Sequence, residues 1–190
     1  MLSRRRLLVL GAAASANATL FIPSADAAPR GHGGRSHGHA PGTKERAITL
    51  HNIHTGESLK TVYWSEGRYH ASVMKQLNHL LRDHYSGDVH IMDPQVIDLL
   101  SALQQRLQVH RPFQIISGYR SPKTNAWLAS MSDGVAQHSL HMEGKAVDIR
   151  LEGVSVRALG RAARGLKAGG VGQYPESDFV HVDVGRVRTW

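Results

Sequence analysis

The stretch from Ser139 to Asp148 constrains this chain most, because it joins a histidine to a carboxylate across one bend. It reads S-L-H-M-E-G-K-A-V-D, and His141 lies seven residues before Asp148. Seven residues along a helix span about 10.5 Å, too far for two ligands of one metal ion. We therefore expect Gly144 to turn the chain and 146–149 to form a strand.

A second segment near the C-terminal end supplies another imidazole, His181, in the sequence F-V-H-V-D. Its valines alternate with His181 and Asp183, which predicts a strand with one apolar and one polar face. If this strand lies beside the one through Asp148, the two side chains can share a metal ion. Two histidines and one carboxylate form an open zinc site that leaves a position for water. We predict one catalytic Zn²⁺ per chain, held by His141, Asp148 and His181.

Composition excludes several other classes of protein. The 190 residues suit one domain, and the absence of cysteine excludes disulfides and thiolate metal sites. The formal net charge is +8, which favours anionic partners such as cell-wall polymers. Nucleic acid is disfavoured because no basic stripe is interleaved with aromatic residues.

The N-terminus has the pattern of an export signal. Three arginines, Arg4 to Arg6, precede an apolar run from Leu7 to Leu20, and Ala25-Asp26-Ala27 resembles a signal-peptidase site. The arginines resemble a twin-arginine signal, so we expect export to the periplasm and no integral membrane segment after cleavage. We assign 1–27 to the signal, 28–45 to a disordered linker rich in histidine and glycine, and 46–190 to the folded domain.

Periodicity in the rest of the chain predicts an α+β domain with a small, mainly antiparallel sheet and flanking helices. The expected strands are 47–52, 58–64, 113–117, 146–149, 171–174 and 179–184, and the expected helices are 69–84, 93–107, 123–131 and 155–167. Helix starts are indicated by Asp93 before Pro94 and by Ser121 before Pro122.

Hydrolysis of an amide at such a zinc site also needs a proton carrier and a group that stabilises the oxyanion. Asp178, three residues before His181, is the first candidate for the proton carrier, if it lies in a turn. Asp183 is a rival, or a group that orients the His181 imidazole, and His138 is a third candidate. Arg120 follows a short apolar strand and is our candidate for the oxyanion or a substrate carboxylate.

Three ordered motifs carry a resemblance: S-G-Y-R-S around Arg120, the stretch from Ser139 to Asp148, and F-V-H-V-D around His181. Together they resemble the VanX and D-Ala-D-Ala carboxypeptidase group of zinc peptidases, and most closely its murein endopeptidase branch. The resemblance implies the hedgehog-like fold of that group, with the same zinc ligands and with Arg120 facing the oxyanion or substrate. Tyr119 and Ser139, which lie in the matching motifs, become candidate substrate contacts. Much of the group has Glu where this chain has Asp178, which leaves the proton carrier open.

The function expected from these features is hydrolysis of peptide cross-links in peptidoglycan by a monomeric, exported zinc metallopeptidase. Its partners would be stem peptides and their cross-links. Three alternatives remain open: a D-alanyl carboxypeptidase or dipeptidase with the same zinc chemistry, a non-catalytic wall-binding module that keeps zinc, and a metal buffer that uses the histidine-rich segment.

Overall fold

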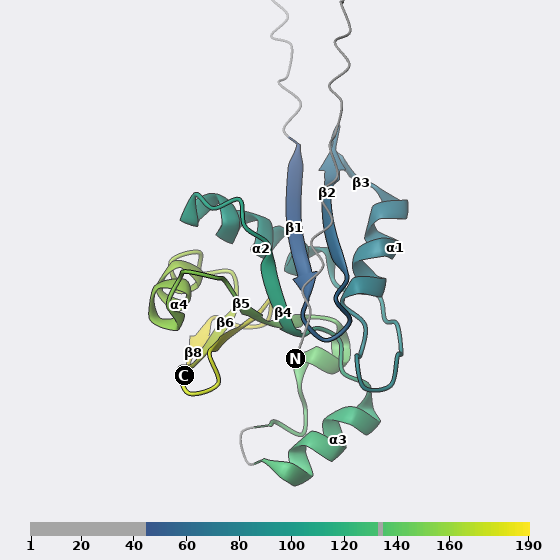
Figure 1. The fold of residues 1–190 in the computed structure, drawn as a ribbon, viewed down its shortest axis with the longest axis vertical. Coiled ribbons are helices and arrows are strands. Elements are labelled where there is room, and N and C mark those ends of the chain that lie inside the picture. The colour runs from purple at the N-terminus through teal and green to yellow at the C-terminus, as the bar shows by residue number, and fades with distance from the viewer. Residues whose placement is uncertain (1–44, 133–134) are drawn as a thin grey trace, which may run out of the picture. The chain divides into compact units, whose positions relative to one another are not determined.

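Eight strands form one mixed sheet in the computed structural model, which describes residues 45–132 and 135–190 (Figure 1). The strands are β1 (Arg46–Asn52), β2 (Ser58–Ser65), β3 (Arg68–Tyr69), β4 (Phe113–Ser117), β5 (Ala146–Arg150), β6 (Gly170–Tyr174), β7 (Phe179–Asp183) and β8 (Arg188–Thr189). Their order in the sheet is β3-β2-β1-β4-β5-β7-β6-β8. β1 pairs with β4 and β6 with β8 in parallel, and the other neighbours are antiparallel. The predicted α+β class with a mainly antiparallel sheet is confirmed.

The helices are α1 (Ala71–Leu80), α2 (Pro94–Leu107), α3 (Pro122–Met131) and α4 (Val156–Arg164), with a short 3-10 helix, η1 (Leu140–Glu143). α2, α3 and α4 each begin directly after a residue whose side chain caps the helix. The Asp93, Ser121 and Ser155 side chains each accept a hydrogen bond from a backbone N–H in the first turn of α2, α3 and α4. These bonds satisfy donors that have no partner inside the helix.

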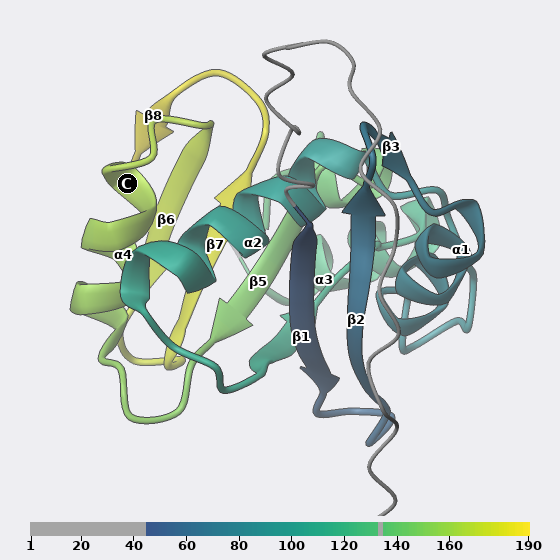
Figure 2. The ribbon, with the colours of Figure 1, turned by 90° about the horizontal axis from the view of Figure 1, so that it is seen from above.

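α2 and α4 lie side by side over one face of the sheet, and α3 lies beyond the other face (Figure 2). The main core fills the space beneath α2 and α4, where Leu100 of α2 and Leu159 of α4 belong to the same buried cluster as Val147 and Val182. Because side chains alternate along a strand, the neighbours of these valines on β5 and β7 face the opposite side. Asp148 and His181 occupy those positions.

Two predicted helices are shorter than expected. The helix predicted over 69–84 ends at Leu80, because the Leu81 carbonyl accepts a hydrogen bond from the Tyr119 N–H and Asp83 accepts bonds from the turn that follows. The helix predicted over 155–167 ends at Arg164, and Gly165 is its C-cap. The two-residue strands β3 and β8 were not predicted, since they are too short to show any periodicity.

The expected export signal at 1–27 and nearly all of the expected linker at 28–45 lie outside the described residues. Within residues 45–132 and 135–190, every helix is too short or too polar to cross a bilayer.

Candidate metal centre and substrate cavity

The register of β5 and β7 places Asp148 directly opposite His181. His141 comes from η1, which precedes β5 and ends at Gly144. Gly144 has φ +66°, and a Cβ there would lie 2.5 Å from the Ile91 carbonyl oxygen, so the turn requires glycine. This turn folds His141 back over β5, and one nitrogen from each imidazole and one oxygen of Asp148 lie close enough to hold one metal ion.

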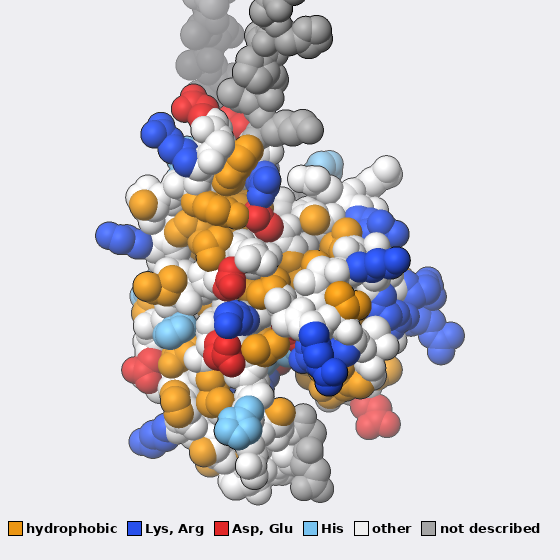
Figure 3. Space-filling view, turned by 180° about the vertical axis from the view of Figure 1, so that it is seen from behind, with side chains coloured by type: hydrophobic (Ala, Val, Ile, Leu, Met, Phe, Trp, Pro, Cys, Tyr) orange, Lys and Arg blue, Asp and Glu red, His pale blue; other side chains and the backbone are white. Residues whose placement is uncertain are grey.

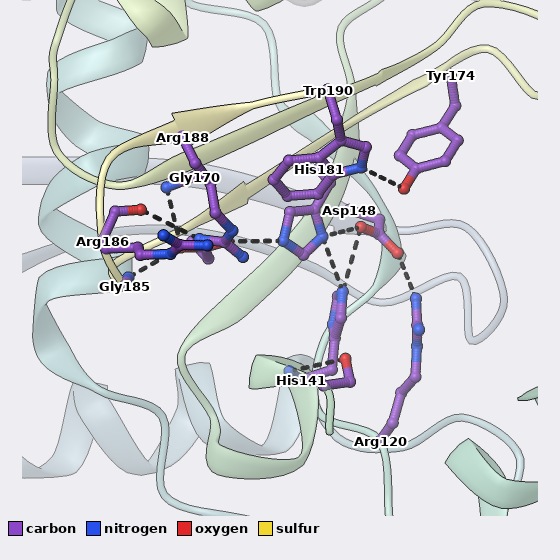
Figure 4. Close-up of polar contacts among 12 residues, drawn as sticks. Arg120, His141, Asp148, Gly170, Tyr174, His181, Gly185, Arg186, Arg188 and Trp190 are labelled. Carbon is purple, nitrogen blue, oxygen red and sulfur yellow. Dashed lines mark hydrogen bonds and ion pairs between the residues drawn. The ribbon is translucent and has the colours of Figure 1, made fainter. Parts of the chain in front are cut away.

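The outer contacts of the two imidazoles determine which ring nitrogen faces inward (Figure 4). His141 Nδ1 lies 2.7 Å from the Gly118 carbonyl oxygen, so it carries the proton and donates. His181 Nε2 lies 3.1 Å from Asp183 Oδ2 and donates in the same way. In the neutral tautomers, His141 Nε2 and His181 Nδ1 therefore present lone pairs to each other and to Asp148 Oδ1.

The three inward atoms are 2.8–3.2 Å apart. This spacing is close to the roughly 3–4 Å expected between ligands of one tetrahedral zinc ion. Three acceptors that converge in a buried place need a shared cation, because lone pairs facing each other repel. The donor set and its spacing therefore fit a metal ion.

The electrostatics of the triad favour an anionic Asp148. Burial opposes its ionisation, but His141 and His181 hold the pKa of this carboxyl well below its usual range. Burial lowers the pKa of His141, which keeps that imidazole neutral. For His181 burial acts in the same direction, but its bonds to Asp148 and Asp183 outweigh burial and raise the pKa.

Arg120 reaches the triad from the segment between β4 and α3. Its Nη2 donates to Asp148 Oδ2, the carboxylate oxygen that does not face the imidazoles, and its Nε donates to Ser117 Oγ at 2.8 Å. Its backbone N–H donates to the His141 carbonyl, which fixes the two segments together. Arg120 and the triad open on a cavity of about 450 Å³.

Asp183 lies behind the triad and is completely buried. Besides His181, it accepts backbone hydrogen bonds from Gly170 and Gly185, and Arg188 donates to both of its oxygens at 3.0 and 2.8 Å. Burial raises the pKa of Asp183, but these donors together lower it well below the usual range. The structure thus places Asp183 as a group that orients His181, away from the open side of the cavity.

The remaining candidates occupy different places. Asp178 lies in the turn before β7 with φ +52°, and its carboxylate pairs with Arg150 at 3.2 Å rather than lining the cavity. Ser139 lines the cavity and accepts a hydrogen bond from the His141 backbone N–H. His138 also lines the cavity, whereas Tyr119 stacks on His90 outside it.

Two residues of the site were missed by the sequence reasoning. Neither Arg188 nor Trp190 was assigned to the site, yet both line the cavity beside His181. Both depend on β8, which pairs with β6 through two residues and leaves no periodic pattern to detect. The one available signal was an arginine five residues after Asp183, which is too weak to use alone.

Comparison with known proteins places this geometry in a family. A family model described as peptidoglycan L,D-endopeptidase MepK matches residues 40–190. The MepK protein of Escherichia coli (strain K12) is 39% identical over 190 residues, covering 99% of this chain and 97% of that protein, and the Shigella flexneri protein of the same name matches equally well. A Haemophilus influenzae protein named a probable peptidoglycan L,D-endopeptidase MepK is 40% identical over 148 residues, covering 77% of this chain and 80% of that protein.

Proposed function

We propose, from the premise that this chain belongs to the MepK family of M15 peptidases, that it is a zinc-dependent endopeptidase that hydrolyses peptide cross-links of peptidoglycan. The observation that carries the chemistry is the convergence of His141, Asp148 and His181 beside Arg120 in an open cavity. Relatives named L,D-endopeptidases at 39% identity support a cross-link whose scissile bond joins an L to a D centre. The apolar run and arginines at the N-terminus support export to the periplasm.

In this proposal His141, Asp148 and His181 hold the ion through Nε2, Oδ1 and Nδ1. A bound Zn²⁺ would polarise the scissile carbonyl and acidify a water molecule. The Gly118 carbonyl and Asp183 keep each imidazole in the tautomer that binds metal. These contacts are already made in the structure, so the site needs little reorganisation before it binds.

Arg120 would stabilise the negative charge that develops on the carbonyl oxygen. One of its nitrogens bonds Asp148 and another bonds Ser117, which fixes the guanidinium at the edge of the cavity. Such a fixed cation acts without rearranging during the reaction, and its side chain is 14% exposed, so solvent screens it little.

Three residues are candidates for the proton carrier of this mechanism: His138, Asp178 and Asp183. Of the three candidates, His138 is the one that lines the cavity. Asp183 is enclosed by His181, Arg188 and two backbone donors, so it has no path to a substrate. Asp178 remains a prediction that requires its side chain to leave Arg150 and turn toward His181. Kinetics of His138→Ala and Asp178→Asn separate these two assignments, since the true carrier should cost about 10²–10⁴-fold in kcat.

The test combines elemental analysis with digestion of purified cross-linked muropeptide dimers. We expect one zinc ion per chain, loss of cleavage after chelation, recovery on adding Zn²⁺, and neither metal nor activity in His141→Ala. The products should be monomers, whereas a carboxypeptidase would only shorten the stem peptides. Metal-free protein that cuts dimers at the full rate, or zinc-loaded protein that leaves them intact, would overturn the proposal.

A further inference from the structure

The walls of the cavity differ in chemistry on the two sides of the triad (Figure 4). On one side are Tyr174 of β6, Phe179 of β7 and Trp190, and on the other are Arg120 and the turn that carries His141. The Tyr174 and Phe179 rings stack with their centroids 4.4 Å apart, and the Trp190 indole N–H donates to the Tyr174 hydroxyl at 2.8 Å. An aromatic wall and a guanidinium wall therefore flank the same metal centre.

Trp190 is fixed from several directions. Its backbone N–H donates to the Val171 carbonyl, and its carbonyl accepts from the Gln173 N–H, which extends the pairing of β8 with β6. The indole lies against Gly172, where a Cβ would come within 2.6 Å of the ring. The Arg188 guanidinium lies 4.8 Å from the ring centroid.

Although it is fixed in this way, Trp190 remains 51% exposed, and it faces the cavity with its ring centroid 5.3 Å from that of His181. A large aromatic ring that is already immobilised can bind a ligand without a further loss of side-chain entropy. A packing role alone does not explain why about half of this ring is exposed, because an apolar side chain stabilises the fold through the area that it buries.

We propose that Trp190 and Tyr174 form a subsite that binds the methylene chain of the cross-linking diamino acid of the substrate, an inference that rests on the proposed function. A cross-link joins a carboxyl group of one stem peptide to a side-chain amine of another, and that amine ends a chain of methylene groups. The chain matches the aromatic wall, while Arg120 on the other side of the triad faces the scissile carbonyl. The two walls thus hold the scissile bond in a single orientation over the metal centre.

Steady-state kinetics on a soluble, L,D cross-linked muropeptide dimer test the subsite. Trp190→Ala should raise KM about 10-fold and change kcat less than about twofold, as expected when binding contacts are lost. Trp190→Phe should restore most of the affinity. The matched control is Trp127→Ala, because Trp127 of α3 is 47% exposed and does not line the cavity. This variant should behave as wild type.

Two further measurements separate the subsite from its alternatives. Zinc content should be unchanged in Trp190→Ala, and calorimetry with metal-free protein should give an about 10-fold weaker dissociation constant for the uncleaved dimer. An unchanged KM and dissociation constant would overturn the subsite, and so would a fall in kcat with loss of zinc, which would make Trp190 only a support for His181. If the wild type binds the dimer through Trp190 but never cleaves it, the proposed function fails and the subsite stands.

Discussion

At the scale of single residues, two contacts outside the triad decide what the triad can bind. The Gly118 carbonyl and the Asp183 carboxylate each accept a hydrogen bond from one imidazole N–H, which leaves the other ring nitrogen facing inward. Without them, either ring could present an N–H toward Asp148 and form an ordinary hydrogen bond in place of a metal site. In the proposed site, the ligands would thus be specified by residues that never touch the ion.

Replacing Asp183 tests this dependence. Asp183→Asn should weaken zinc affinity about 10–100-fold. The amide lacks the negative charge that accepts hydrogen bonds from the His181 N–H and the Arg188 guanidinium, so the imidazole is oriented less firmly. Competition with a chelating dye measures the affinity directly. Asp178→Asn is the matched control, since the Asp178 carboxylate pairs with Arg150 and with none of the three side chains of the triad. Equal affinities for wild type and Asp183→Asn would show that His181 is oriented by other groups.

Arg120 offers a second prediction at this scale. Arg120→Gln should lower kcat on cross-linked dimers about 10²–10³-fold, the usual loss when one oxyanion donor is removed. Zinc content should remain near one ion per chain, because Arg120 bonds the carboxylate oxygen that does not face the imidazoles. Arg68→Gln, at an exposed arginine of β3, controls for loss of one positive charge. A kcat that stays within about threefold of the wild type would exclude the oxyanion role.

The sequence predicted best the residues that lie in segments where apolar and polar residues alternate. Alternation around Asp148 and His181 predicted two strands with polar faces, and Gly144 predicted the turn that brings in His141. The turn position of Asp178 was foreseen, but its ion pair was not predictable, because it depends on a positive φ and on Arg150 from another strand. Arg188 and Trp190 could not be assigned either, since no local pattern indicates that β8 joins the sheet.

At the scale of elements, the bounds of α2 and α3 were predictable to within a residue or two, whereas the ends of α1 and α4 were not. Caps such as Asp93 and Ser121 are local signals, whereas α1 ends where Leu81 and Asp83 find partners beyond their own helix. Asp83 links two elements, because it accepts hydrogen bonds from Tyr85 in its own turn and from Ser121 at the start of α3. That link also fixes the segment that carries Arg120.

The link through Asp83 should make stability depend on pH. Asp83 is 1% exposed, and although burial raises its pKa, hydrogen bonds from Thr124 and Ser121 lower it to about 2. Because the folded pKa lies below 3.8, the usual value for an aspartate, this carboxylate stabilises the fold fully above pH 3.8 and loses its effect as the pH falls toward 2. Asp83→Asn should lower the free energy of unfolding by about 2–3 kcal/mol at pH 7.

Urea unfolding of wild type and Asp83→Asn at a series of pH values measures this effect. The difference between the two proteins should be constant from pH 7 to about pH 5 and should shrink below pH 3.8. A difference that is independent of pH down to 2 would mean that the Asp83 carboxylate is not held as an anion by its partners.

Helix α4 carries a different element-scale property, since its outer face is cationic. Lys and Arg side chains gather on the side of the molecule where α4 lies (Figure 3). Arg157 and Arg161 are exposed, and neither forms an ion pair within the part of the chain that the structure describes. α4 covers the face of the sheet opposite the triad, so this charge can attract an anionic polymer without blocking the cavity.

Removing that charge should affect large substrates more than small ones. Arg157→Gln/Arg161→Gln should digest purified sacculi several-fold more slowly than wild type at low salt, with the difference vanishing at high salt. Soluble dimers should be cut at the wild-type rate. Lys60→Gln/Arg68→Gln removes the same charge from the β2–β3 hairpin and serves as the control. Equal losses in the two double variants would mean that net charge acts rather than the α4 face.

At the scale of the whole molecule, one ion would tie together three parts of the chain: η1, β5 and β7. A ligand that binds the folded chain alone stabilises it by about 2.7 kcal/mol when its free concentration is 100 times its dissociation constant. For a domain of this size that corresponds to a rise in Tm of roughly 5–10 °C. Scanning calorimetry with and without a chelator measures the shift. His141→Ala should show no response to the chelator, whereas Trp127→Ala, which does not alter the cavity lining, should respond as wild type does. If removing zinc from the loaded wild type with a chelator left its Tm unchanged, the three segments would not share an ion. The proposed zinc chemistry would then fail together with the predicted stabilisation.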